Sequence, residues 1–115
     1  MLALREMPSA DDFRRIALAF PGTEERAHMG HPDFRVGGRV FATLGAPDSE
    51  HGMVALLTEQ QELAMAAAPD AFTPAAGAWG REGSTLVRLQ TVSDEWLERT
   101  LRWAWERRAP AKLRG

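Results

Sequence analysis

The stretch DFRVGGRVFATL, residues 33 to 44, decides the fold of this chain. Two short runs rich in β-branched and aromatic residues flank the pair Gly37 and Gly38. A two-residue hairpin turn of type I′ needs a positive φ at both central residues, and glycine adopts this conformation without strain. The stretch therefore predicts a β-hairpin with strands over residues 33–36 and 39–44.

The register of this hairpin follows from its turn. With a two-residue turn, Val36 lies opposite Arg39 and Phe34 lies opposite Phe41, so the two phenylalanines are expected to form a cross-strand core pair. Arg35 is expected to point outward, while Arg39 lies near the hairpin tip. The two predicted faces are Phe34, Val36, Arg39, Phe41 and Thr43 on one side and Asp33, Arg35, Val40, Ala42 and Leu44 on the other.

Helix and strand signals extend outward from the hairpin in both directions. Ser9 is the expected N-cap of a first helix, which Pro21 and Gly22 end. Thr58 begins a TEQQ capping box, and Ser93 is the expected N-cap of the last helix. The remaining elements are a strand over 23–29, a buried strand over 52–57, a helix to about residue 68, a loop over 69–83 and a strand over 84–90.

The predicted element order is α-β-β-β-β-α-β-α. Strands linked by hairpins, with helices segregated around them, are typical of an α+β fold. The alternation that parallel βαβ units require is absent from the sequence. The sequence therefore predicts a two-layer domain with an antiparallel sheet of about five strands and helices packed on one face.

Length and composition indicate an ordinary globular domain. The chain has 115 residues, 44% of them hydrophobic, which suits a single domain over 1–115 with a frayed tail over 108–115. There is no cysteine, no apolar run long enough to cross a membrane, and no export signal at the N-terminus. We therefore expect a cytoplasmic protein without a membrane partner.

Five segments spread along the chain together resemble one known family. They are FPGTEE, GHPDFRVGGRVFATL, LLTEQQELA, FTPAAGAWG and LRWAWERRAP, within residues 13 to 110. This ordered set resembles the MmcQ/YjbR family. The resemblance implies a YjbR-like α+β domain, similar in shape to secretion chaperones. It also implies a DNA-binding role through β-hairpin wings.

The charge of the chain makes strong DNA binding unexpected. The net charge is −2, although residues 81 to 115 carry 8 basic and 5 acidic groups and are therefore net positive. Proteins that bind DNA obtain much of their affinity by neutralising phosphates. We expect weak, salt-sensitive contacts, and the predicted DNA-binding residues are Arg35, Arg39, Arg81 and Arg88. These arginines can equally be solubilising charges on a sheet edge.

The rival hypothesis is a module that binds a small ligand or a protein in a pocket. Its candidate residues are His28, His31 and Trp79, which lie in polar or glycine-rich segments. On a continuous strand His28 and His31 face opposite sides, so they converge only if Gly30 turns the chain. A pair of histidines without cysteine is a weak zinc signal, and no metal site is predicted.

Signals for catalysis are absent from the sequence. There is no cysteine, and no G-x-S-x-G motif is present. The paired carboxylates fall at a helix start and on a surface strand, where solvation accounts for them. We therefore expect a protein that is not an enzyme and needs no cofactor. Either a monomer or a homodimer is compatible with the sequence.

Overall fold

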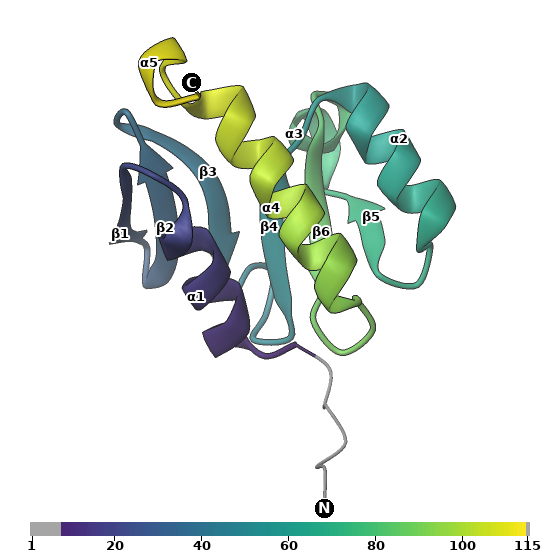
Figure 1. Ribbon diagram of the computed structural model, residues 1–115. Coiled ribbons are helices and arrows are strands. Elements are labelled where there is room, and N and C mark those ends of the chain that lie inside the picture. Colours follow the sequence, from purple (N-terminus) through teal and green to yellow (C-terminus); the bar gives the residue numbers. More distant parts are fainter. Residues whose placement is uncertain (1–7, 115) are drawn as a thin grey trace, which may run out of the picture.

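The hairpin predicted at Gly37 and Gly38 forms two interior strands of an antiparallel sheet (Figure 1). The structure, a computed structural model, describes residues 8–114. The two turn glycines have φ values of 59° and 78°, as a type I′ turn requires. Strand β2 (His31–Val36) precedes this turn and β3 (Arg39–Leu44) follows it.

Six strands form the sheet, in the order β1-β2-β3-β4-β6-β5. Every neighbouring pair is antiparallel. The other four strands are β1 (Thr23–His28), β4 (His51–Ala55), β5 (Phe72–Pro74) and β6 (Ser84–Arg88). The α+β class predicted from the sequence is confirmed, with six strands in place of about five.

Helices α1 and α4 cover one face of the sheet, and α2 packs beside α4 and β5 (Figure 1). The core between these layers contains the aromatic rings of Phe13, Phe34 and Phe72, all of them buried. No helix among residues 8–114 is long and apolar enough to span a membrane. The helices are α1 (Ala10–Ala19), α2 (Thr58–Ala67), α3 (Gly77–Arg81), α4 (Asp94–Arg108) and α5 (Ala111–Arg114).

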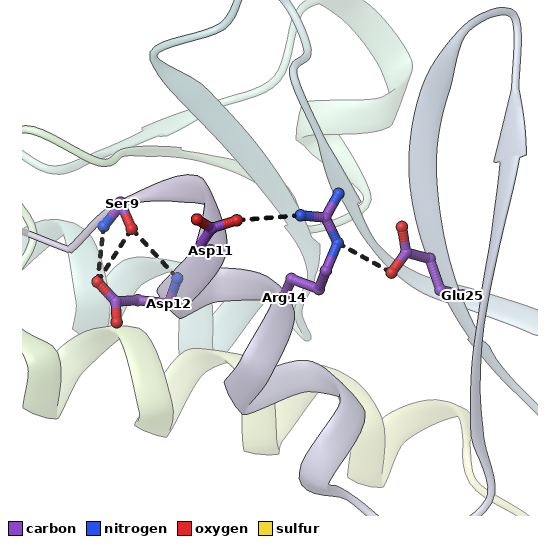
Figure 2. Close-up of polar contacts among 5 residues, drawn as sticks. All are labelled: Ser9, Asp11, Asp12, Arg14 and Glu25. Carbon is purple, nitrogen blue, oxygen red and sulfur yellow. Dashed lines mark hydrogen bonds and ion pairs between the residues drawn. The ribbon is translucent and has the colours of Figure 1, made fainter.

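The first helix is capped and tied to the sheet by side chains close to its start (Figure 2). Ser9 Oγ accepts from the Asp12 backbone N–H, and the Ser9 backbone N–H donates to Asp12 Oδ2, so the predicted N-cap is confirmed. Arg14 bridges Asp11 on the helix and Glu25 on β1, with an Nε–Oε1 distance of 2.9 Å to Glu25. This bridge holds the outermost strand β1 against α1.

A β-bulge changes the predicted register of the hairpin. Val36 lies opposite Arg39 as predicted, but the register shifts between Phe34 and Arg35, and Phe34 lies opposite Ala42. The predicted pairing of Phe34 with Phe41 is therefore wrong. The ring of Phe34 packs instead on Phe13 of α1, with centroids 5.9 Å apart. The position of the Phe34 ring depends on packing between the sheet and α1, which the alternation of residues along a strand does not predict.

Two short elements lie in the segment predicted to be a loop, residues 69–83. Strand β5 pairs with β6, and Pro74 is tolerated because β5 is an edge strand.

The predicted TEQQ capping box is displaced by one residue. Leu57 occupies the N-cap position, and its backbone N–H donates to Gln60 Oε1 at 3.0 Å.

The end of the described chain is helical where the sequence predicts a frayed tail. Helix α5 follows α4 after a short link, and Leu113 packs against the core. The tip of the β2–β3 hairpin approaches the same link, because a Cβ at Gly37 would lie 3.0 Å from Pro110 Cγ. Leu113 is partly buried against the core, and this tertiary contact cannot be predicted from the sequence of four residues.

Candidate functional site

The turn between β1 and β2 brings His28 and His31 together. Met29 and Gly30 have φ values of 51° and 82° and form the turn. The chain therefore turns at Gly30, as the convergence of His28 and His31 requires. The two histidines lie opposite each other, with ring centroids 6.5 Å apart. Among residues 8–114, no three His, Asp or Glu side chains are placed to hold a metal ion together.

A buried carboxylate organises the surroundings of His28. The side chain of Asp33 is fully buried, and its Oδ2 lies 2.6 Å from His28 Nδ1. Arg35 donates from Nε to Asp33 Oδ1 at 2.8 Å and from Nη2 to Oδ2 at 3.0 Å. The hydrogen bond from Arg35, helped by His28, lowers the pKa of Asp33 although burial opposes the shift. Asp33 is therefore an ionised carboxylate at neutral pH.

Asp33 belongs to a cross-strand row on the face of the sheet opposite helices α1 and α4. Phe34 packs on α1, so the adjacent Asp33 faces the other way. Thr43 lies opposite Asp33, and Met53 lies opposite Thr43. Thr43 is buried, and its Oγ1 has no hydrogen-bond partner among the described residues. The row thus places a buried hydroxyl between a carboxylate and a thioether.

A pocket of about 400 Å³ opens on this face, where the short helix α3 borders the sheet. Two of the three predicted pocket residues, His28 and Trp79, line it, although they are far apart in the sequence. The third, His31, lies across the β1–β2 turn from His28 and is not part of the lining. We call this site the Trp79 pocket; its lining residues are His28, Met53, Ala75, Ala76 and Trp79.

Gln61 of α2 anchors α3 through Gly80, the residue that follows Trp79, although the sequence places it only in the predicted capping box. Gln61 is buried, and its Nε2 donates to Gly80 O at 3.0 Å and to Thr85 Oγ1 at 3.1 Å. A third contact joins Nε2 to Ser84 O at 3.2 Å. The TEQQ pattern assigns Gln61 to the capping box. Because the helix starts one residue earlier, Gln61 is not a capping residue and is available to anchor α3.

Replacing Gln61 by leucine is expected to lower the free energy of unfolding by about 1–2 kcal/mol, because buried carbonyl and hydroxyl groups lose their donor. Urea unfolding followed by circular dichroism measures this loss. The control is Gln90→Leu at an exposed glutamine, for which a change within about 0.5 kcal/mol is expected. Equal stabilities of the two variants would contradict the anchoring role of Gln61.

The structure does not bring the four predicted DNA-binding arginines together. Arg35 is paired with Asp33 on the face opposite α1 and α4, whereas Arg39 lies opposite Val36 on the face that these helices cover. Arg81 ends α3, just before β6 begins. Arg88 ends β6 and lies opposite His51. Because β3, β4 and β6 alternate in direction, Arg39 and Arg81 lie at one end of the sheet and Arg88 at the other.

Arg88 belongs to a polar depression of about 650 Å³ at its end of the sheet. His51 Nδ1 lies 2.7 Å from Asp48 Oδ1 beside it. The hydrogen bond from His51 is the main reason that the pKa of Asp48 is lowered, and Arg88 contributes through its charge. Glu50 and Asp70 also line the depression, so its charge is mixed.

A cluster of basic side chains lies where the β2–β3 hairpin meets the C-terminal helices. Burial and the charges of Arg107 and Arg39 lower the pKa of Arg108. Within residues 8–114, none of these side chains forms an ion pair with a carboxylate. We call this region the basic end; it comprises Arg39, Arg107 and Arg108, together with Lys112 and Arg114 of the adjoining helix α5.

The sequence points to the basic end only through the net positive charge of residues 81 to 115. Of its five members, Arg39 alone is among the predicted site residues. The exposed members are Arg39, Lys112 and Arg114. Arg107 instead donates from Nη1 to Leu56 O and ties α4 to the end of β4.

Comparisons with known proteins agree with this architecture. The crystal structure of the Deinococcus radiodurans protein DR2400, with the family-model domain DUF419, superimposes with a TM-score of 0.71 at 22% identity. The match covers 86% of this chain and 77% of that chain. Among curated proteins, none matches significantly. The model of the YjbR family matches residues 18–107, which is most of the chain. With its six-stranded antiparallel sheet and this match, the chain belongs to the YjbR family.

Proposed function

We propose that the protein is a non-enzymatic DNA-binding protein whose basic end contacts the phosphate backbone. The observation that carries the proposal is the basic end itself. The charges of Arg39 and Arg107 act on Arg108, and Lys112 and Arg114 lie on the adjoining helix α5. Within residues 8–114, none of the five has a carboxylate partner. Mutual repulsion of these cations favours a bound polyanion, and neutralised phosphates release counterions. A cytoplasmic location is part of the same proposal.

In this proposal the β2–β3 hairpin contacts DNA phosphate through Arg39. Arg39 is exposed beside the two-residue turn, and the turn lies against Pro110, which leads into α5. Lys112 and Arg114 are exposed on α5. These three exposed side chains belong to adjoining elements, and in this proposal one DNA strand contacts all three.

The other predicted arginines contribute unequally. Arg35 is engaged by Asp33 and is removed from the set of phosphate contacts. Arg81 lies at the same end of the sheet as Arg39 and is exposed, so it stays a predicted contact. Arg88 lies at the opposite end beside mixed charges and is an unfavourable contact. The net charge of −2 keeps the expected affinity low.

The proposal that the protein is not an enzyme is based on the side chains that contact His28. Asp33 and His28 form a carboxylate–imidazole pair of the kind that activates a nucleophile in hydrolases. Within the described residues, Asp33 is the only side chain hydrogen-bonded to His28. Such a pair without a hydroxyl or thiol nucleophile positions a ring but performs no acyl transfer.

The charge-reversal variant Arg39→Glu/Lys112→Glu tests this proposal. Both side chains are exposed, so the fold is expected to persist. Fluorescence anisotropy with a labelled DNA duplex at about 50 and about 200 mM salt is expected to show a steep salt dependence for the native protein. The variant is expected to bind at least about tenfold more weakly, and its log–log salt slope falls by about 2.

The matched control is Arg15→Glu/Arg99→Glu, which changes the net charge equally on exposed helix surfaces away from the basic end. It is expected to retain the salt slope of the native protein, because no phosphate contact is lost. Absence of binding by the native protein at low salt would overturn the proposal. Equal losses in the two double variants would show that net charge alone, and not the basic end, governs binding.

A further inference from the structure

The Trp79 pocket carries an inference that is independent of DNA. We propose that it binds a small planar aromatic molecule that carries one hydrogen-bond donor, such as a phenol or an indole. The pocket lies on the face of the sheet opposite α1 and α4, whereas Arg39 of the basic end lies on the other face of its hairpin. The two sites can therefore be tested separately.

The wall of the pocket selects an apolar, flat ligand. Trp79 is 71% exposed, which is unusual for the largest apolar side chain, and it stands beside Met53 and Ala75. An indole face favours stacked aromatic rings, and a thioether makes favourable contacts with ring edges. The volume of about 400 Å³ lies in the range of small-ligand pockets.

The polar end of the pocket selects a hydrogen-bond donor. Arg35 keeps Asp33 ionised, so the carboxylate only accepts hydrogen bonds. His28 Nδ1, at 2.6 Å from Asp33 Oδ2, must therefore carry a proton. In the neutral ring Nε2 is then the acceptor, and it belongs to a ring that lines the pocket. A ligand O–H or N–H satisfies this acceptor.

A second polar group with unused bonding capacity lies in the same part of the sheet. Thr43 Oγ1 is buried without a hydrogen-bond partner among the described residues, between Asp33 and Met53. Buried hydroxyl groups are ordinarily hydrogen-bonded, so this exception calls for a partner. Met53, the neighbour of Thr43 in the row, lines the pocket, whereas Thr43 lies outside the lining, one residue behind the pocket wall.

The experiment is an NMR titration of the ¹⁵N-labelled protein with three probes: p-cresol, indole and toluene. The expected shifts centre on the Trp79 side-chain N–H and the amides of His28 and Met53. For ligands of this size a Kd of about 1 mM is expected for p-cresol and indole. Toluene has the shape of p-cresol without the hydroxyl and is expected to bind at least fivefold more weakly.

Two variants separate the roles of wall and acceptor. Trp79→Ala is expected to weaken all three probes at least tenfold. His28→Phe keeps the apolar wall but removes Nε2, so p-cresol and toluene are expected to bind equally. The control is Leu63→Ala, at an exposed leucine of α2 outside the pocket, which is expected to bind like the native protein.

Each result decides for or against the proposal. Shifts confined to the pocket, with a preference for p-cresol that His28→Phe removes, support it. Absence of shifts with every probe, shifts centred elsewhere, or a preference that persists in His28→Phe overturns it. The comparison of p-cresol with toluene on the native protein does not depend on whether Trp79→Ala folds. Neither His28 nor Trp79 belongs to the basic end, so loss of DNA binding leaves this result unaffected.

Discussion

Replacing Gly83 by alanine is expected to lower the free energy of unfolding by more than about 4 kcal/mol, which is a large share of the total stability of a typical domain. Gly83 is buried and has a φ of +111°, a conformation that a residue with a side chain rarely adopts. A Cβ there would lie 1.9 Å from the backbone oxygen of Leu56. Backbone cannot move aside as a flexible side chain can.

The physical reason for this close approach is a backbone hydrogen bond. Leu56 N donates to Gly83 O at 3.2 Å, where the end of β4 meets the start of β6. The two strands are central in the sheet. A side chain at Gly83 therefore disrupts the pairing of β4 with β6, which joins the β2–β3 hairpin side of the sheet to β5.

The matched control is Gly38→Ala. Gly38 also has a positive φ, +78°, but a Cβ at this residue would have no other atom within 4 Å. Only the left-handed backbone conformation is penalised, at about 1–2 kcal/mol. Thermal and urea unfolding of both variants, followed by far-UV circular dichroism, tests the comparison. A Gly83→Ala protein as stable as Gly38→Ala would show that the backbone at Leu56 relaxes freely.

Replacing Asp33 by asparagine is expected to cost about 2–3 kcal/mol of the free energy of unfolding. Breaking a fully buried ion pair costs about 3–5 kcal/mol, because the remaining charge stays desolvated. Arg35 and His28 keep side-chain exposures of 28% and 47%, so water partly solvates them once Asp33 is neutral. This access to water places the expected cost below the full penalty.

The effect of Asp33→Asn depends on pH in a defined direction. The pKa of Asp33 is lowered on folding from its ordinary value of 3.8. The ionised carboxylate therefore stabilises the native protein fully above about pH 5, and this contribution is lost as the pH falls below 3.8 through the folded-state pKa. The stability difference between the native protein and Asp33→Asn is expected to shrink in this acidic range.

Urea unfolding at neutral pH and at acidic pH measures this difference. The control is Asp48→Asn, whose carboxylate also pairs with a histidine but is 59% exposed. An exposed ion pair contributes at most about 1 kcal/mol, so a small change is expected at neutral pH. If Asp33→Asn and Asp48→Asn lose the same stability, burial does not strengthen the Asp33 network.

Local signals predict much of the fold because their causes lie within a few residues. The double glycine at 37–38 dictates its turn, and Ser9 and Ser93 cap their helices through side-chain oxygens three residues from the N–H that they bind. Such interactions need no partner from elsewhere in the chain. Strand β5 escapes prediction because three residues ending in proline are stabilised as a strand only by their pairing with β6.

The candidate site is predictable only in part, for the same physical reason. The residue types of His28, Trp79 and Arg39 mark them as candidates, and His28 and Trp79 do share a pocket. Asp33 is not among the predicted site residues, because its burial depends on Arg35 and His28 closing over it. A carboxylate in a strand is typical of a surface residue until its neighbours across the sheet are known.

By itself, the sequence determined the α+β class, the central hairpin, the helix starts at Ala10 and Asp94, and the family to which the chain belongs. Only the tertiary structure decided the bulge at Phe34, the burial of Asp33 and the gathering of the basic end. Turns and caps depend on dihedral angles and hydrogen bonds between near neighbours. Burial and charge clustering depend on which distant segments meet, and the packing of layers settles that.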